Sequence, residues 1–264
     1  MSDTTPSGDV SVPLRPEDDH QLAIRLATEA GAILLQLRDE LPRKGFHRWD
    51  IMDTGDVTAH RFLADALARA RPDDIVLSEE GADDRRRLTS DRVWIVDPLD
   101  GTNEYGEPGR PDWAVHVALW EQGALTAGAV ALPALGMTLG TDPPPVIPAS
   151  NRARPRIVTS RYRPPYAAIR IAEALGCDAI RVGSAGAKAM MLVLGEGDIY
   201  VHDGGMYQWD SAAPAAVAAA AGLFVSRIDG SPIVYNEPDP WLPDFLICRP
   251  ELAGDVLEAL WGRR

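Results

Sequence analysis

Apolar residues recur at two different spacings along this chain, and the change of spacing separates helices from strands. From Glu17 to Arg38 and again from Val57 to Arg71, apolar side chains follow the spacing of an amphipathic helix. Asp18 or Asp19 stands where it could cap the first helix, and residues 41–53 are irregular and polar. Helices followed by several strands predict an α+β first half. The expected strands, all rich in β-forming residues, are 74–77, 93–96, 113–121, 124–132 and 137–141.

A proline-rich segment, residues 142–155, interrupts this pattern, and four of its first seven residues are proline. We expect a domain boundary there, with an N-terminal α+β domain over residues 17–146 and a C-terminal domain over residues 155–264. In the second half strands alternate with helices, which is typical of an α/β arrangement. The expected strands are 156–159, 179–182, 198–201 and 223–227, and the expected helices are 165–175, 185–194 and 210–221.

The composition argues against several kinds of protein. A formal net charge of −13 over 264 residues, with no basic stretch to offset it, disfavours binding to a nucleic-acid backbone. The apolar run at 212–225 is rich in alanine and broken by Pro214 and Gly222, so we expect no membrane span. Residues 1–16 are polar, lack the apolar segment of a signal peptide and are expected to form a disordered tail. Two cysteines without metal-type spacing agree with a cytoplasmic protein.

The stretch from Arg92 to Gly106, which reads RVWIVDPLDGTNEYG, carries the clearest chemical signal. An apolar strand delivers Asp97 and Asp100 onto a turn that the intervening proline and the following glycine enforce. The two carboxylates can converge there, and the Leu99 carbonyl between them is a further oxygen ligand. These are hard donors, which suit Mg²⁺ better than zinc or copper. The alternative is an ordinary acidic turn after a buried strand.

Three more carboxylates stand at the ends of predicted elements. Asp56 precedes the second helix, Glu79 follows the strand at 74–77, and Asp210 opens an alanine-rich helix. Each has a purely structural explanation, since Asp56 and Asp210 could be helix caps and Glu79 a surface glutamate. Their occurrence together, in both halves of the chain, is what a cleft with two cations needs.

Other phosphate and metal motifs fit the sequence less well. An EF-hand loop starting at Asp97 would need an oxygen ligand at its third position and glycine at its sixth, where the chain has Leu99 and Thr102. The D-x-x-D-x-T spacing differs from the D-x-D-x-T of phosphatases that form an aspartyl-phosphate, and no GxxxxGK[ST] P-loop is present. The five histidines show no ligand-type spacing, so surface or core roles are expected for them.

Three segments together resemble the signature regions of the inositol monophosphatase superfamily. They read LSEE at 77–80, WIVDPLDGTNE at 94–104 and WDSAAPAAVAAAAG at 209–222, in the family's order. Two further segments, VTSR at 158–161 and GSAGAKAM at 183–190, are most similar to the 3'(2'),5'-bisphosphate nucleotidase branch, particularly its actinobacterial members. The resemblance implies an α+β/α/β fold, the layered α-β-α-β-α sandwich of the inositol monophosphatase and fructose-1,6-bisphosphatase type.

The resemblance also implies two or three Mg²⁺ ions in each active site. Asp56 matches the position of an acidic residue near a weaker third ion. The Thr102 hydroxyl, paired with Glu79, would orient and help to deprotonate the attacking water. The implied metal ligands are Glu79, Asp97 and the Leu99 carbonyl for one ion, and Asp97, Asp100 and Asp210 for the other.

Substrate contacts are implied in both halves of the chain. A Gly-Ser-Ala-Gly segment opening a helix is a ready anion site, so Ser184 is expected to meet a phosphate there and Lys188 to add a point charge for a second phosphate. A glycine turn with a solvated lysine is the alternative. The other implied contacts are Gly101, Thr102 and Asn103 on the acidic turn, and Ser160 and Arg161 near the nucleotide.

The implied activity is hydrolysis of a small phosphate monoester by Mg²⁺-activated water. In the nucleotidase branch this removes the 3'-phosphate of 3'-phosphoadenosine 5'-phosphate, or of 3'-phosphoadenylyl sulfate, in sulfate assimilation. Inositol-1-monophosphatase or fructose-1,6-bisphosphatase activity with the same metal chemistry is the alternative. A catalytically silent metal or nucleotide sensor is a third hypothesis. The resemblance further implies inhibition by lithium and allows a homodimer.

Overall fold

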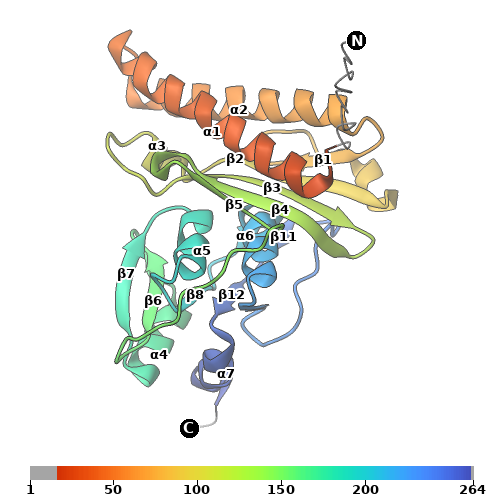
Figure 1. The fold of residues 1–264 in the computed structure, drawn as a ribbon. Coiled ribbons are helices and arrows are strands. Elements are labelled where there is room, and N and C mark those ends of the chain that lie inside the picture. Colours follow the sequence, from red (N-terminus) through yellow and green to blue (C-terminus); the bar gives the residue numbers. More distant parts are fainter. Residues whose placement is uncertain (1–16, 263–264) are drawn as a thin grey trace, which may run out of the picture.

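Two long helices cover one face of the first sheet, in a computed structural model that describes residues 17–262 (Figure 1). The predicted tail at residues 1–16 lies outside the described residues. Helix α1 (Asp19–Arg43) begins as predicted, because the Asp18 carboxylate accepts a hydrogen bond of 2.8 Å from the Gln21 N–H. The helix continues beyond Arg38 because Leu41 is still buried.

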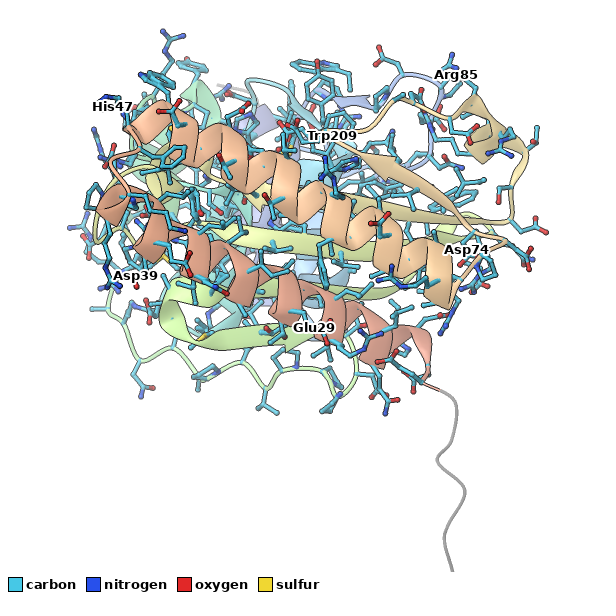
Figure 2. All side chains as sticks on the ribbon, turned by 90° about the horizontal axis from the view of Figure 1, so that it is seen from above. Glu29, Asp39, His47, Asp74, Arg85 and Trp209 are labelled. Atoms are coloured by element: carbon cyan, nitrogen blue, oxygen red, sulfur yellow. The ribbon has the colours of Figure 1, made fainter. Side chains whose placement is uncertain are left out.

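Helix α2 (Arg48–Ala70) begins well before Val57, so the prediction of an irregular segment at 41–53 was wrong. The Asp50 carboxylate accepts a hydrogen bond of 3.1 Å from the His47 N–H and fixes the first turn, while Ile51 is buried below it. Asp56 therefore lies inside the helix rather than at its entrance. Figure 2, seen from above, shows α1 and α2 running side by side across the sheet.

The first sheet is buried on both faces. Strand β1 pairs in parallel with β2, and the remaining pairs are antiparallel in the order β1-β2-β3-β4-β5. Along β2 the side chains alternate: Trp94 and Val96 pack toward α1 and α2, whereas Val93 and Ile95 pack on the opposite face. The elements of this half are β1 (Ile75–Ser78), a 3₁₀ turn at Arg85–Thr89, β2 (Arg92–Asp100), α3 (Thr102–Tyr105), β3 (Ala114–Glu121), β4 (Ala124–Leu132), a 3₁₀ turn at Pro133–Leu135 and β5 (Met137–Gly140).

The second half alternates strands and helices as predicted and adds elements that the sequence pattern did not indicate: β9, β11, β12 and α7. Its main sheet has the order β10-β12-β8-β6-β7, and β9 pairs separately with β11. The elements are β6 (Arg156–Ser160), α4 (Tyr166–Leu175), β7 (Asp178–Val182), α5 (Ala185–Val193), β8 (Ile199–His202), β9 (Met206–Tyr207), α6 (Gln208–Ala220), β10 (Phe224–Ser226), β11 (Trp241–Leu242), β12 (Phe245–Cys248), a 3₁₀ turn at Pro250–Leu252 and α7 (Ala253–Trp261).

The elements stack in the predicted α-β-α-β-α order (Figure 1). Helices α5 and α6 lie between the two sheets, and α4 and α7 cover the far face of the second sheet. The expected layered sandwich is therefore confirmed. Residues 141–155 form no helix or strand between the sheets, yet one hydrophobic core contains both Ile95 and Val182. The division into two domains at this segment stays a prediction.

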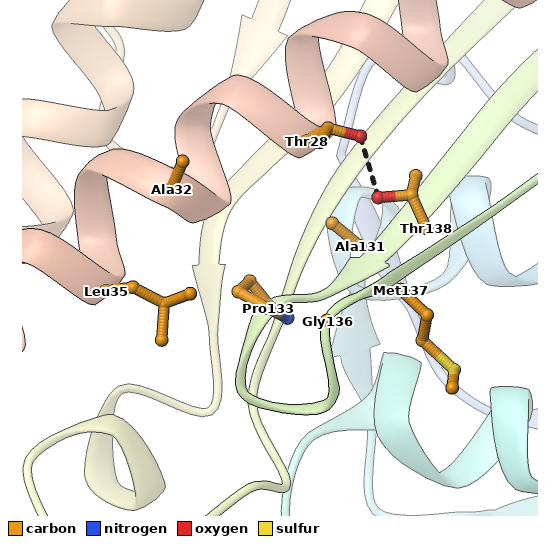
Figure 3. Close-up of a pocket in the computed structure, with 8 residues that line it drawn as sticks. All are labelled: Thr28, Ala32, Leu35, Ala131, Pro133, Gly136, Met137 and Thr138. Carbon is orange, nitrogen blue, oxygen red and sulfur yellow. Dashed lines mark hydrogen bonds between the residues drawn. The ribbon is translucent and has the colours of Figure 1, made fainter.

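Two surface features bear on what the fold can do. Among residues 17–262, no helix combines the length and the apolar character needed to cross a membrane. A hollow of about 300 Å³ lies between α1 and the β4–β5 hairpin, and a hydrogen bond of 2.7 Å between the Thr28 and Thr138 hydroxyls bridges its edge (Figure 3). Its lining includes Leu35, Pro133 and Met137 and contains no charged residue, so it does not suit a phosphate group.

Candidate metal centre

The acidic turn at the end of β2 is built by local backbone constraints. The Asp97 Oδ1 atom accepts a hydrogen bond of 3.0 Å from the Leu99 N–H, and the pairing with β3 becomes irregular between Asp97 and Asp100. Gly101 then adopts φ +85°, a left-handed conformation that favours glycine. A Cβ atom at that position would also lie 2.9 Å from the Ser184 Cβ, so the turn packs directly against the start of α5.

Three carboxylates converge beside this turn. Asp97, Asp100 and Asp210 each offer an oxygen, and these oxygens lie within 4.8 Å of one another. Asp97 is buried, and its Oδ2 atom has no hydrogen-bond partner among residues 17–262. Burial, followed by the charges of Asp100, Glu79 and Asp210, raises the pKa of Asp97 well above its ordinary value. A divalent cation bound by hard carboxylate oxygens would compensate this repulsion, so the donor set fits a metal ion.

Asp210 reaches the cluster from the first turn of α6. Its Oδ2 atom accepts a hydrogen bond of 2.6 Å from the Tyr207 N–H, which anchors the carboxylate at the start of the helix. Burial and the negative charge of Asp100 raise the pKa of Asp210 to about 6. The prediction that a residue from beyond the proline-rich segment joins the acidic turn agrees with this geometry.

Asp100 is the one member of the cluster that the protein itself neutralises. Its carboxylate accepts hydrogen bonds from the Ser184 hydroxyl, the Ala185 N–H at 3.1 Å and the Gly186 N–H at 2.6 Å, all at the start of α5. Burial opposes ionisation, but the charge and contact of His116 and the Ser184 bond outweigh it and lower the pKa of Asp100 to about 2. The anion held at the expected anion site of α5 is therefore this carboxylate.

Glu79, Asp56 and Thr102 line the rim of the cluster. Glu79 follows β1, and the burial of its carboxyl, followed by the charges of Asp210, Glu80 and Asp100, raises its pKa to about 7. Burial and the charges of Glu80 and Glu79 likewise raise the pKa of Asp56 to about 7. The Thr102 Oγ1 atom lies 3.1 Å from the Leu99 carbonyl oxygen and 3.4 Å from Asp56 Oδ1.

Comparison with known proteins identifies the family. Residues 16–262 match the sequence profile of the Inositol monophosphatase family. The chain belongs to the inositol monophosphatase family. Proteins of this family are metal-dependent phosphatases, and the cluster of Asp97, Asp100 and Asp210 is a suitable metal site within this member.

Several relatives of this family member carry names that state an activity. It is 48% identical over 241 residues to a protein of Mycobacterium tuberculosis (strain CDC 1551 / Oshkosh) named 3'-phosphoadenosine 5'-phosphate phosphatase, covering 88% of this chain and 89% of the relative. A protein of Escherichia coli (strain K12) named 3'(2'),5'-bisphosphate nucleotidase CysQ is 29% identical over 245 residues, covering 84% of this chain and 96% of the relative. The predicted family and its nucleotidase branch are thus supported by named relatives.

Solved structures agree on the fold of the family. The extragenic suppressor protein suhB from Bartonella henselae superposes with a TM-score of 0.73 at 23% identity, covering 90% of this chain and 97% of that one. CysQ from Bacteroides thetaiotaomicron superposes with a TM-score of 0.72 at 24% identity, covering 88% of this chain and 97% of that one. At these identities the similarity shows a shared fold.

His116 of this family member is a residue of the site that sequence reasoning missed. The ring is buried on β3, with Nε2 3.2 Å from Asp100 Oδ2 and Nδ1 3.1 Å from the Trp209 carbonyl oxygen. Burial opposes a charged ring, but the charge of Asp100 outweighs it and raises the pKa of His116. The β2–β3 hairpin pairs His116 directly with Asp97. Strand alternation across that hairpin was the signal that could have found it.

Lys188 lies in a different setting from the one expected. Its side chain is buried, and Nζ donates to the carbonyls of Gly183 and Ser184, the latter at 2.9 Å, while lying 5.3 Å from the centre of the Tyr200 ring. The alternative of a solvated lysine is excluded. Contact of Ser184 and Lys188 with a substrate phosphate stays a prediction.

The remaining predicted substrate contacts already have partners in the protein. The Asn103 carbonyl accepts a hydrogen bond of 2.9 Å from the Arg48 guanidinium. Arg161 Nη1 lies 2.9 Å from a Glu107 carboxylate oxygen and 3.3 Å from a Glu104 oxygen. Ser160 Oγ accepts a hydrogen bond of 3.3 Å from the N–H two residues on. Their roles in substrate binding stay predictions.

Proposed function

We propose that this protein is a Mg²⁺-dependent phosphomonoesterase that removes the 3'-phosphate of 3'-phosphoadenosine 5'-phosphate during sulfate assimilation. The observation that carries the proposal is the cluster of Asp97, Asp100 and Asp210, found in a chain 48% identical to a mycobacterial protein named for this reaction. 3'-Phosphoadenylyl sulfate is a second candidate substrate, because it carries the same 3'-phosphate.

The donor set suits Mg²⁺, since every ligand is a carboxylate or carbonyl oxygen. The unpartnered Asp97 Oδ2 atom is the feature that most needs a cation. When bound, Mg²⁺ would neutralise phosphate oxygens and lower the pKa of the attacking water. We assign Glu79, Asp97 and the Leu99 carbonyl to one ion, Asp97, Asp100 and Asp210 to a second, and Asp56 to the surroundings of a weaker third.

The chain's own residues would hold and deprotonate the water. Thr102 has one hydroxyl proton, which it can donate to the Leu99 carbonyl or to Asp56, and its oxygen stays free to accept a hydrogen bond from the water. Glu79 is the candidate base. The backbone N–H groups of Gly101 and Thr102 stand next to the carboxylates and are the proposed donors to the phosphate.

A comparison of substrates tests the proposal. Purified protein with Mg²⁺ should hydrolyse 3'-phosphoadenosine 5'-phosphate with a kcat/KM at least about 10-fold above that for inositol 1-phosphate and fructose 1,6-bisphosphate, which is a difference of about 1.4 kcal/mol in transition-state stabilisation. A tenfold preference for either sugar phosphate would overturn the assignment of the substrate. Absence of hydrolysis of all three, with Mg²⁺ still bound, would identify a metal or nucleotide sensor instead.

A further inference from the structure

Three aromatic rings form a partly exposed cluster beside the metal carboxylates. The rings of Tyr207 and Trp209 stack with centroids 4.7 Å apart and an interplanar angle of 11°. The Trp241 ring meets Tyr207 edge-on at 5.4 Å. Tyr207 is 42% exposed and Trp241 is 46% exposed. Trp209 is labelled in Figure 2. We call Tyr207, Trp209 and Trp241 the aromatic cluster.

A small strand pair holds the aromatic cluster in position. Strands β9 and β11 are two residues long each, and their register pairs Tyr207 with Trp241. Gly205, at φ +79°, passes directly against the Trp241 indole, where any side chain would overlap the ring. The Gln208 N–H donates a hydrogen bond of 2.8 Å to the Pro240 carbonyl and ties the start of α6 to the same loop. These contacts fix rings that remain open to solvent.

The aromatic cluster is connected directly to the metal site. The Tyr207 N–H donates to Asp210 Oδ2 at 2.6 Å, so the backbone that carries the Tyr207 ring contacts a carboxylate of the metal site. The Trp209 carbonyl faces His116 Nδ1 at 3.1 Å, and His116 in turn faces Asp100. The segment that carries two of the three rings therefore also contacts the residues of the metal site.

We infer that the aromatic cluster is the surface on which the nucleobase of the substrate stacks; the inference rests on the proposed function. Exposed rings fixed next to a phosphate-handling site suit a flat ligand, because nucleobases stack on aromatic side chains. None of the three side chains carries a charge, so the cluster would contact the base, and the phosphates would be bound by other groups. Inositol and fructose phosphates have no planar group to place there.

Kinetics on a matched pair of substrates test this inference. Tyr207→Ala and Trp241→Ala should each lower kcat/KM for 3'-phosphoadenosine 5'-phosphate about 10-fold, mainly through KM, and leave kcat/KM for the baseless ribose 3,5-bisphosphate unchanged. Tyr207→Phe should retain activity because it keeps the ring. Trp261→Ala, which alters a 61% exposed tryptophan on α7, is the control. Equal losses on both substrates, or no loss on the nucleotide, would overturn the inference.

A binding measurement separates this inference from the proposed function. Adenosine 5'-monophosphate has no 3'-phosphate to remove, so calorimetric titration with it reads the base contact without turnover. Weaker binding by the Tyr207→Ala and Trp241→Ala variants than by wild type supports stacking, even if the nucleotide substrate is not hydrolysed. Tyr162→Ala, which alters a 59% exposed tyrosine outside the aromatic cluster, is the comparison variant. Equal binding by wild type and the cluster variants, or weaker binding by Tyr162→Ala alone, overturns the inference. So does a change of oligomeric state in the variants with unchanged kcat/KM, since the cluster would then be a contact between copies of the chain.

Discussion

His116 Nε2 lies 3.2 Å from Asp100 Oδ2, while Nδ1 of the same ring lies 3.1 Å from the Trp209 carbonyl oxygen. Nδ1 is thus hydrogen-bonded to a carbonyl, whereas Nε2 makes no hydrogen bond among residues 17–262 but lies close to the negative charge of Asp100. The arrangement favours the charged ring, which agrees with the raised pKa of His116. The charge of this ring and the donors at the start of α5 keep Asp100 ionised, whereas the Oδ2 atom of Asp97 has no hydrogen-bond partner among residues 17–262.

Replacing His116 by asparagine should therefore weaken metal binding. Loss of a group that orients a metal ligand typically costs 10- to 100-fold in metal affinity or activity, so we expect the half-saturating Mg²⁺ concentration to rise about 10-fold. The measurement is the rate of phosphate release across a Mg²⁺ titration. His20→Asn, at a histidine that bonds Thr141 outside the metal site, is the control. An unchanged Mg²⁺ dependence would show that the ring serves packing alone.

Replacing Asp97 by asparagine should have opposite effects on activity and on the stability of the metal-free protein. The buried carboxylate has an oxygen without a partner and three acidic neighbours, so removing its charge relieves repulsion. We expect a higher Tm than wild type in EDTA, no further rise on adding Mg²⁺, and a fall of about 100-fold or more in kcat. Full hydrolysis by this variant would contradict the proposed mechanism.

Most helices and strands and the acidic turn could be predicted from the sequence because they depend on local patterns, whereas the layered arrangement was implied by the family resemblance. Helical and strand periodicity, and the proline and glycine of the turn, are read within a few residues. The first turns of α2 could not be found that way: the exposed Trp49 and Asp53 flank the buried Ile51 and Met52 and disguise the apolar stripe. Asp56 was consequently expected at the entrance of the helix instead of within it.

Partners that meet only in the tertiary structure were beyond local patterns. The segment opening at Ser184 was expected to meet a substrate phosphate, whereas in the structure it binds the carboxylate of Asp100, 84 residues away. Lys188 is one of only two lysines and was expected to contact a substrate phosphate, but its ammonium group donates hydrogen bonds to backbone carbonyls. The aromatic cluster joins Tyr207 to Trp241 through strands of two residues, which are too short to be predicted by periodicity.

The stability of the metal-free protein should fall as the pH rises toward neutrality. The folded pKa values of Glu79 and Asp56 are about 7 and that of Asp210 is about 6, all above the ordinary values of 4.5 and 3.8. Groups with raised folded pKa values contribute their stability below the ordinary pKa and lose it as the pH rises through the folded value. The lowered pKa of Asp100 acts only between about 2 and 3.8, below this window.

Thermal unfolding in EDTA from pH 4.5 to pH 8 measures this effect. We expect Tm to decrease across the range, and a saturating concentration of Mg²⁺ to remove most of the decrease above pH 6, because cations replace the protons. Asp56→Asn should flatten the curve, since one of the titrating groups is gone. A Tm in EDTA that is constant or increases over this range would refute the raised pKa values.

Replacing Gly101 by alanine should destabilise the protein more than the same change at Gly123. Both glycines have left-handed φ values, +85° and +94°, so alanine brings about 1–2 kcal/mol of backbone strain at either position. At Gly123 nothing lies within 4 Å of an added Cβ, whereas at Gly101 the Cβ would lie 2.9 Å from the Ser184 Cβ. Denaturant unfolding should give a larger loss of unfolding free energy at Gly101, by about 1 kcal/mol or more, because the α5 terminus must shift.

That shift would also move the donors that hold Asp100, so Gly101→Ala should raise the Mg²⁺ concentration needed for half-maximal activity, while Gly123→Ala leaves it unchanged. Equal losses of stability would mean that the turn and α5 are not packed as tightly as the 2.9 Å approach requires.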